Sequence, residues 1–198
     1  MRTIRSIFAL AYVLVVPFRL LAQDIVPGQE WYGEAGGEIS APVGELSDGA
    51  SIGYGLAGMI GRAVAPSTSV GLQYVYNRHA TSGFMSGVDG GFTTSSFFLG
   101  VHHVTSEKLS FAGNGRISLL AGIGVGFYSL DVDNAYGEGS YSFSDNDLAV
   151  QLGVGVMIPT GSEKKSEYIQ PSLRYRTLLS GDVRAAVLAL NIAWAGWM

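Results

Sequence analysis

The chain has no cysteine among its 198 residues, which excludes thiolate zinc sites, iron–sulfur clusters, disulfides and cysteine nucleophiles. Charged residues are scarce as well, at 14% of the chain against about 25% in soluble domains. There are 12 Lys and Arg against 16 Asp and Glu, so the protein lacks the basic field that nucleic-acid partners require. No apolar run reaches the ~20 residues of a transmembrane helix.

Glycine and aromatic residues are abundant instead. The chain contains 28 Gly, 11% aromatic residues and 47% hydrophobic residues, and the glycine share is well above the usual value of about 7%. A high apolar content with a mild net charge argues against disorder. This composition is typical of many strands whose backbones approach one another closely.

The first 22 residues have the organisation of a secretory signal peptide. Arg2 and Arg5 provide a positive start, residues 7–16 form an apolar core, and Ala22 offers a cleavage point before Gln23. We therefore predict a cleaved signal peptide over 1–22, which exports the chain to the periplasm. A periplasmic lead would follow over 23–30, and the functional domain would occupy 31–198.

Apolar residues in this domain recur at every second position, which is the sequence signature of β-strands. Eight segments show the alternation, the last two less regularly: 51–63, 69–77, 117–127, 148–158, 169–176, 188–194, 31–40 and 93–104. We therefore predict eight strands.

The two faces of these segments differ in residue size. In 148–158, for example, Leu152 and Val154 alternate with Gly153 and Gly155. A soluble sandwich or lipocalin-like barrel points large residues inward and covers its outside with charges. Here the opposite face is mostly small, which suits the narrow interior of an eight-stranded barrel, so the large residues face lipid. We predict an all-β fold: a single closed antiparallel transmembrane β-barrel of eight strands in up-and-down order.

The lengths of the connections predict the orientation, because outer-membrane barrels have short periplasmic turns and longer outside loops. The predicted outside loops are 41–50, 80–92, 131–146 and 180–182, and the predicted inside turns are 64–68, 105–114 and 159–166.

Within the seventh strand, Pro171 removes a backbone donor, so we expect a bulge or locally open pairing there.

Two segments carry a resemblance to a known family. SAPVGEL at 40–46, before a glycine-rich strand, and YIQPSLRYR at 168–176, before an alternating last strand, resemble the outer-membrane β-barrel domain family of OmpA-like and OmpX-like small barrels. The resemblance extends over 31–198, and the usual terminal aromatic would be Trp197, followed here by Met198.

This resemblance implies a monomer in the outer membrane of a Gram-negative-type bacterium. Its partners would be outer-membrane lipids, lipopolysaccharide and, during biogenesis, the barrel-assembly machinery. The resemblance brings no catalytic motif, cofactor or metal site, so we predict that the protein is not an enzyme.

Four charged residues share the face that points away from lipid. Glu34 and Glu38 lie on the first strand, and Arg174 and Arg176 lie on the seventh. The strand between them in a closed barrel carries small residues inward, and charges in so confined a space are costly unless paired. We predict an ion cluster that plugs the lumen and fixes the fold. The alternative is a polar gate or narrow pore.

Aromatic residues near the strand ends are candidates for the girdles at the two membrane interfaces. The principal candidates are Trp31, Tyr76, Tyr128 and Trp194, with Tyr32, Phe127 and Tyr168 as further ones.

Other motifs have simpler explanations. Residues 53–58 match G-x-G-x-x-G, but the match lies inside an alternating strand, whereas a dinucleotide site needs a strand end that opens a helix. His79 is expected at the outer end of the barrel, and His102 and His103 near the inner end, so we expect no shared metal site. The acidic outer loop at 131–146 is expected to be solvated.

Three functions remain open. The leading one is a structural or surface-interaction role. The second is a narrow pore or a conduit for small solutes or apolar molecules. The third is a lipid-modifying enzyme, for which His79, Ser82 and Asp89 offer the residue types of a hydrolase triad without a visible device that orients them.

Overall fold

The fold is described from a computed structural model. It describes residues 31–44, 47, 49–81, 88–112, 114–134, 140–160, 167–179 and 186–197. The predicted signal peptide over 1–22 and lead over 23–30 lie outside these residues. None of the helical segments described is long and apolar enough to cross a membrane.

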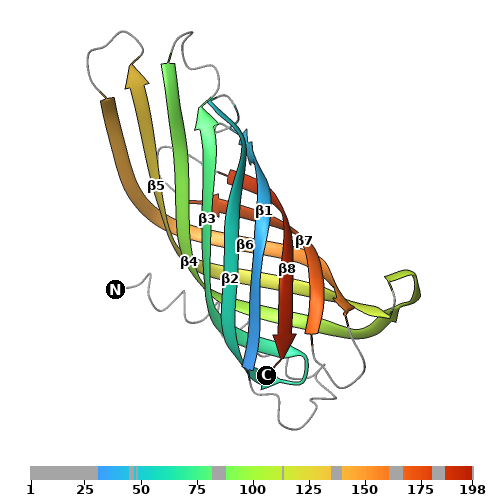
Figure 1. The fold of residues 1–198 in the computed structure, drawn as a ribbon. Coiled ribbons are helices and arrows are strands. Elements are labelled where there is room, and N and C mark those ends of the chain that lie inside the picture. Colours follow the sequence, from blue (N-terminus) through green and yellow to red (C-terminus); the bar gives the residue numbers. More distant parts are fainter. Residues whose placement is uncertain are drawn as a thin grey trace, which may run out of the picture.

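Eight antiparallel strands form a closed barrel in which each strand pairs with its neighbours in sequence and β1 pairs with β8 (Figure 1). The strands are β1 (Trp31–Val43), β2 (Ala50–Ala65), β3 (Thr68–Thr81), β4 (Val88–Leu109), β5 (Gly115–Asn134), β6 (Ser140–Pro159), β7 (Glu167–Leu178) and β8 (Ala186–Trp197). A 3-10 turn, η3 (Ser110–Ala112), follows β4. The predicted all-β, eight-stranded, up-and-down barrel is therefore confirmed.

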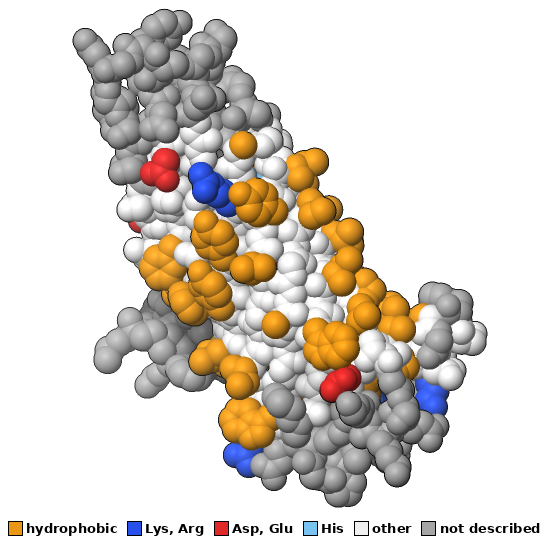
Figure 2. Space-filling model, viewed as in Figure 1, with side chains coloured by type: hydrophobic (Ala, Val, Ile, Leu, Met, Phe, Trp, Pro, Cys, Tyr) orange, Lys and Arg blue, Asp and Glu red, His pale blue; other side chains and the backbone are white. Residues whose placement is uncertain are grey.

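The two-residue period of the sequence separates the lumen from the outer wall. On β8, Leu190 and Ile192 are more than half exposed on the outside, whereas Ala189 and Asn191 are fully buried inside. Figure 2 shows hydrophobic side chains along the visible wall, with charged side chains near its two ends. In water such a wall would be unfavourable, whereas in lipid it is favourable. Closure then pairs the backbone without leaving a sheet edge in the membrane.

Inward-facing glycines allow the strands to pack closely. A Cβ atom at Gly55 would lie 2.0 Å from the carbonyl oxygen of Tyr76, and one at Gly124 would lie 1.7 Å from that of Phe97. Gly53 and Gly55 face the lumen, and β2 continues through the whole of 53–58 as a strand. The literal G-x-G-x-x-G match is therefore a close-packed strand and does not open a helix.

Three strands extend further at the outer end than predicted. β4 begins at Val88, β5 ends at Asn134 and β6 begins at Ser140. The predicted outer loops 80–92 and 131–146 were therefore wrong, because much of each is paired strand. The alternation of large apolar residues stops where lipid contact stops, but backbone pairing continues, supported by β-favouring hydroxyl and aromatic residues. In Figure 1 these three strands rise above the rest of the barrel.

Pro171 interrupts one ladder of the barrel. It pairs with Ile192 of β8, but the β6–β7 pairing passes from Gly155↔Ser172 to Ile158↔Ile169 without intervening partners. The register is the same on both sides of this gap. The expected locally open pairing at Pro171 is thus present, and its cause is the missing N–H donor of proline.

Candidate functional site

The lumen is the candidate functional site because the buried charges lie there. Glu34 and Glu38 project inward from β1, and Arg174 and Arg176 project inward from β7; all four are at most 7% exposed. β8 lies between these strands and presents Ala189 and other small residues to the lumen, so the long Arg side chains can reach across to β1. The structure brings the four charges together as two ion pairs.

The inner pair is Glu34 with Arg174, whose side chains have no solvent exposure. A second oxygen of Glu34 lies 2.8 Å from the hydroxyl of Tyr32, which also lies 2.9 Å from Oε1 of Gln170. Arg174 Nε donates to the hydroxyl of Ser172 over 3.0 Å. Each charge therefore has a hydrogen-bond partner besides its counter-ion, which favours retention of the buried pair, whereas Nη1 of Arg174 has no hydrogen-bond partner among the described residues.

The outer pair is bidentate. Both terminal nitrogens of Arg176 donate to the two carboxylate oxygens of Glu38 at 2.5 Å, which is the geometry that makes arginine–carboxylate pairs strong and specific. Nε of Arg176 donates to Gln151 over 2.8 Å, and the amide of Gln151 donates to Gln73 over 2.8 Å. Side chains of β1, β3, β6 and β7 are thereby joined across the lumen.

An apolar cluster closes the end of the barrel at which β1 begins and β8 ends, the end predicted to face the periplasm. Its buried members are Tyr32, Met59, Val104, Leu120, Met157 and Ala195, with Tyr168 and Trp197 packed against them. The ring of Tyr32 stacks on His102 at 4.3 Å and contacts Trp197 at 5.2 Å. Tyr32 and Tyr168 therefore belong to this inner layer and not to the membrane girdle for which they were candidates.

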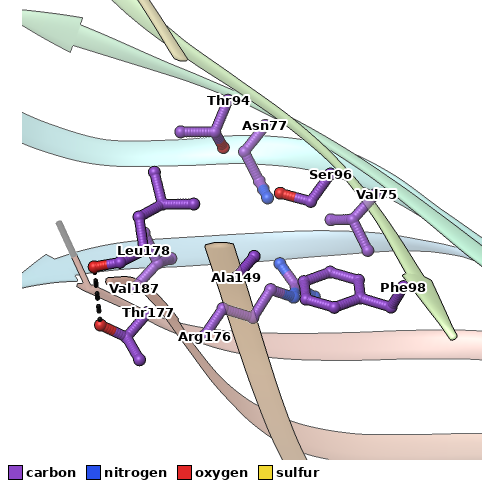
Figure 3. A pocket seen from close by; sticks show the side chains of 10 residues that line it. All are labelled: Val75, Asn77, Thr94, Ser96, Phe98, Ala149, Arg176, Thr177, Leu178 and Val187. Carbon is purple, nitrogen blue, oxygen red and sulfur yellow. Dashed lines mark hydrogen bonds between the residues drawn. The ribbon is translucent and has the colours of Figure 1, made fainter. Parts of the chain in front are cut away.

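A second apolar cluster, formed by Ala57, Val75, Phe98, Ala149 and Leu178, lies at the level of the outer ion pair. It borders a small cavity, lined also by Asn77, Ser96 and Thr177, into which Arg176 projects. Figure 3 shows Arg176 and Phe98 among the side chains that surround this cavity. The cavity volume of about 30 Å³ holds about two water molecules. It has no room for an organic ligand.

The histidines lie in two separate places. His79 is buried near the outer end, with its ring nitrogens 3.3 Å from the hydroxyl of Ser40 and 2.9 Å from the carbonyl oxygen of Ser51. His102 is buried near the inner end, beside Tyr32. Among the described residues no three His, Asp or Glu side chains are grouped as metal ligands would be. Of the possible hydrolase triad, Ser82 and the side chain of Asp89 lie outside the described residues.

The predicted girdle residues fall in two registers. Trp31 and Trp194 point outward and are 47% and 53% exposed, and Tyr76 shares the outward face of β3. Tyr128 lies in the inward register of β5 instead, with its ring 6.3 Å from that of Phe92. The sequence could have indicated that Tyr128 faces inward, because it lies an even number of residues from the lumen glycines at positions 122, 124 and 126.

Comparison with known proteins addresses the fold alone. No family model and no curated protein matches this chain. Among solved structures it is similar to Ail, the attachment invasion locus protein of Yersinia pestis, in complex with the heparin analogue sucrose octasulfate: the identity is 18%, the TM-score is 0.57, and the match covers 84% of this chain and 98% of Ail. This chain has the fold of a small outer-membrane β-barrel. Ail in a phospholipid bilayer nanodisc is also similar, with 16% identity, a TM-score of 0.50, and coverage of 84% and 99%.

Proposed function

We propose that the protein is a non-conducting, monomeric outer-membrane barrel with a structural or surface-interaction role. The observation that carries this proposal is the double closure of the lumen. Two Glu–Arg pairs cross it, and the apolar cluster around Tyr32 fills its periplasmic end. The extended outer parts of β4, β5 and β6 provide the surface that meets the environment.

Outer-membrane residence is part of this proposal. The predicted signal peptide would deliver the chain to the periplasm, and the barrel-assembly machinery would insert it. The apolar outer wall and the fold shared with Ail support this route. Fractionation of cells that express the full chain tests it: the barrel should appear in the outer-membrane fraction, shortened by the leader. A full-length chain in the inner membrane would contradict the route.

The narrow pore is the second candidate function, because buried polar side chains such as Gln73, Gln151 and Asn191 line the lumen. Solute flux separates the two candidates. Liposomes that carry refolded 23–198 should not swell in arabinose or glycine faster than empty liposomes. Swelling that is faster than in empty liposomes, and that changes in Arg174→Ala but not in the outward-facing control Arg62→Ala, would establish the pore.

The proposal includes no catalysis. The contact between Ser40 and His79 has the residue types of a nucleophile and its base, but both side chains have no solvent exposure, and the other ring nitrogen of His79 faces a carbonyl instead of a carboxylate. Mass spectrometry of lipid A from cells with and without the protein tests this point. The two profiles should be identical, and a chain-dependent loss of an acyl group would contradict the proposal.

A further inference from the structure

The outer part of β6 is paired on one side only. Its pairing with β5 continues without a register shift as far as Ser140. On the other side, the pairing with β7 ends at Ala149, and one further hydrogen bond joins the N–H of Leu179 to the carbonyl oxygen of Leu148 over 2.7 Å. No other described residue pairs with β6 on this side. We call residues 140–147 the free edge of β6; in Figure 1 they lie at the border of the three raised strands.

The free edge presents a regular row of backbone groups. The carbonyl of Leu148 points toward β7, and in an antiparallel sheet the N–H and C=O of every second residue point the same way. The residues concerned are Asn146, Ser144, Ser142 and Ser140. The N–H of Asn146 donates to the carboxylate of Asp145 over 2.8 Å, which agrees with its pointing away from β5. The three serines therefore offer N–H and C=O groups at steps of about 7 Å, the spacing of another β-strand.

The free edge begins where lipid contact ends. Leu148 points outward and is 42% exposed, and the outward positions that follow toward the outer end are Asn146 and the three serines. An unpaired strand edge is not tolerated in hydrocarbon, whereas in water it can pair with a strand from another chain. The free edge contains no proline or lysine and no bulge against β5, which are common devices that prevent such pairing.

Two carboxylates lie on the face of the free edge that continues from the lumen. Asp145 is the register partner of Tyr128, whose hydroxyl donates to it over 3.4 Å. Asp147 follows on the same face, and its Oδ2 is buried without a hydrogen-bond partner among the described residues. Neither carboxylate forms an ion pair within the described part of the chain. On an added strand, the Cβ atom opposite each carboxylate would lie about 5 Å away, where an opposite charge stabilises the pairing.

The backbone row and the carboxylates together define the chemistry of a partner. Strand addition takes its affinity from main-chain hydrogen bonds and its specificity from alternate side chains. We propose that the free edge of β6 binds an extended segment of a partner protein as an added β-strand, with lysine or arginine at alternate positions opposite Asp145 and Asp147. The inference rests on the proposed surface-interaction role and gives that role a partner chemistry.

The same carboxylates argue against two other occupants. A second copy of the chain that paired through its own free edge would place carboxylates opposite carboxylates, and like charges directly opposite one another are destabilising. A sulfated or phosphorylated polymer would meet Asp145, Asp147 and, on the outward face of β5, Asp131. A basic extended segment meets neither obstacle.

The test uses the full chain expressed with its own leader and extracted from outer membranes in mild detergent. Fluorescence anisotropy measures the binding of a labelled nine-residue peptide of alternating lysine and threonine. A second peptide has glutamate in place of lysine, and a third keeps lysine but is methylated at every backbone nitrogen, so that it cannot donate along either edge. The lysine peptide should bind at least tenfold more tightly than each of the other two.

Variants of β6 separate the backbone from the charges. Ser144→Pro removes an N–H from the free edge without removing a donor from the β5 ladder, and it should weaken binding of the lysine peptide at least tenfold. Ser144→Ala keeps the N–H at the same position and should bind as the wild type does. In Asp145→Asn/Asp147→Asn, the lysine and glutamate peptides should bind equally.

Contrary outcomes are distinct. Equal binding of the methylated peptide, or unchanged binding in Ser144→Pro, overturns strand addition. A dimer in native mass spectrometry that Ser144→Pro dissociates would assign the free edge to a second copy and overturn the basic partner. Peptide binding to the extracted barrel but not to intact cells that carry it would contradict the proposed surface role and leave the strand site standing. Heat-modifiable migration confirms that each variant is folded, and the methylated peptide carries the backbone test if Ser144→Pro is not.

Discussion

Glu38 and Arg176, 138 positions apart in the chain, form a bidentate ion pair across the lumen of the barrel. Neither residue is more than 7% exposed. The pair joins β1 to β7 over the small side chains of β8, so its energy depends on barrel closure. Removing one partner leaves an unpaired buried charge, whereas removing both leaves a void and no unpaired charge, although Gln151 loses the hydrogen bond from Arg176.

This difference can be measured by a double-mutant cycle. Arg176→Ala should lower the free energy of unfolding in phospholipid vesicles by about 3 kcal/mol or more, because Glu38 is left buried without its counter-ion. The double variant Glu38→Ala/Arg176→Ala should lose less than the sum of the two single losses. Urea titrations give the four values. Additive losses would show that the two side chains do not interact.

The lumen glycines whose Cβ position is already occupied, Gly124 among them, should be intolerant of a single methyl group. Gly124→Ala places its Cβ 1.7 Å from a backbone oxygen of β4, whereas Gly37→Ala has no atom nearer than 3.9 Å. Overpacking that only backbone movement can relieve costs about 1–3 kcal/mol or more. We expect heat-modifiable, folded protein to be lost in Gly124→Ala and retained in Gly37→Ala. Equal folding of the two variants would contradict the packing described here.

The adjacent histidines should respond in opposite directions. Both ring nitrogens of buried His102 have no hydrogen-bond partner among the described residues, so His102→Phe, which keeps a ring against Tyr32, should be neutral or stabilising by up to about 1 kcal/mol. His103→Phe loses the contact of 2.8 Å with Thr68 and should destabilise by about 1 kcal/mol. Urea midpoints in the same vesicles compare them, and the reverse order would be inconsistent with this account.

The two C-terminal tryptophans should also differ. Trp197 packs on Tyr32 in the periplasmic cluster, whereas Trp194 faces outward and is 53% exposed. Trp197→Ala opens a cavity in that cluster and should cost about 2–3 kcal/mol of unfolding free energy. Trp194→Ala should cost less, because its ring packs against lipid on one side only. A larger loss in Trp194→Ala would mean that the periplasmic cluster contributes little.

Most of what the sequence could predict came from residue parity, which is the alternation of inward and outward side chains along each strand. It placed the eight strands, the lipid face and the common inward face of Glu34, Glu38, Arg174 and Arg176. The partner of each arginine could not be read from parity, because it depends on the stagger of β7 relative to β1 around the closed barrel. The outer ends of β4 to β6 were misjudged because the hydrophobic pattern records the edge of the lipid, whereas the strand ends where its backbone pairing ends.

The inward aromatics show the same limit. Tyr32 and Tyr128 alternate in step with lumen residues, yet proximity to strand ends suggested interfacial girdles. Aromatic rings near strand ends occur both in the interfacial girdles and in the layers that close the lumen. An aromatic residue of the girdle differs from one in the lumen only in whether its position along the strand points outward or inward. Deciding this requires following the alternation along the whole strand.

Single-channel recording in planar bilayers tests the sealed lumen most directly. Refolded 23–198 should show no steady conductance, and neither should the outward-facing control variant Arg62→Ala. The triple variant Glu38→Ala/Arg176→Ala/Trp197→Ala should conduct, because it lacks the outer ion pair and has a smaller periplasmic cluster. A steady wild-type conductance that Arg176→Ala changes and Arg62→Ala does not would contradict a closed lumen and make the barrel a pore.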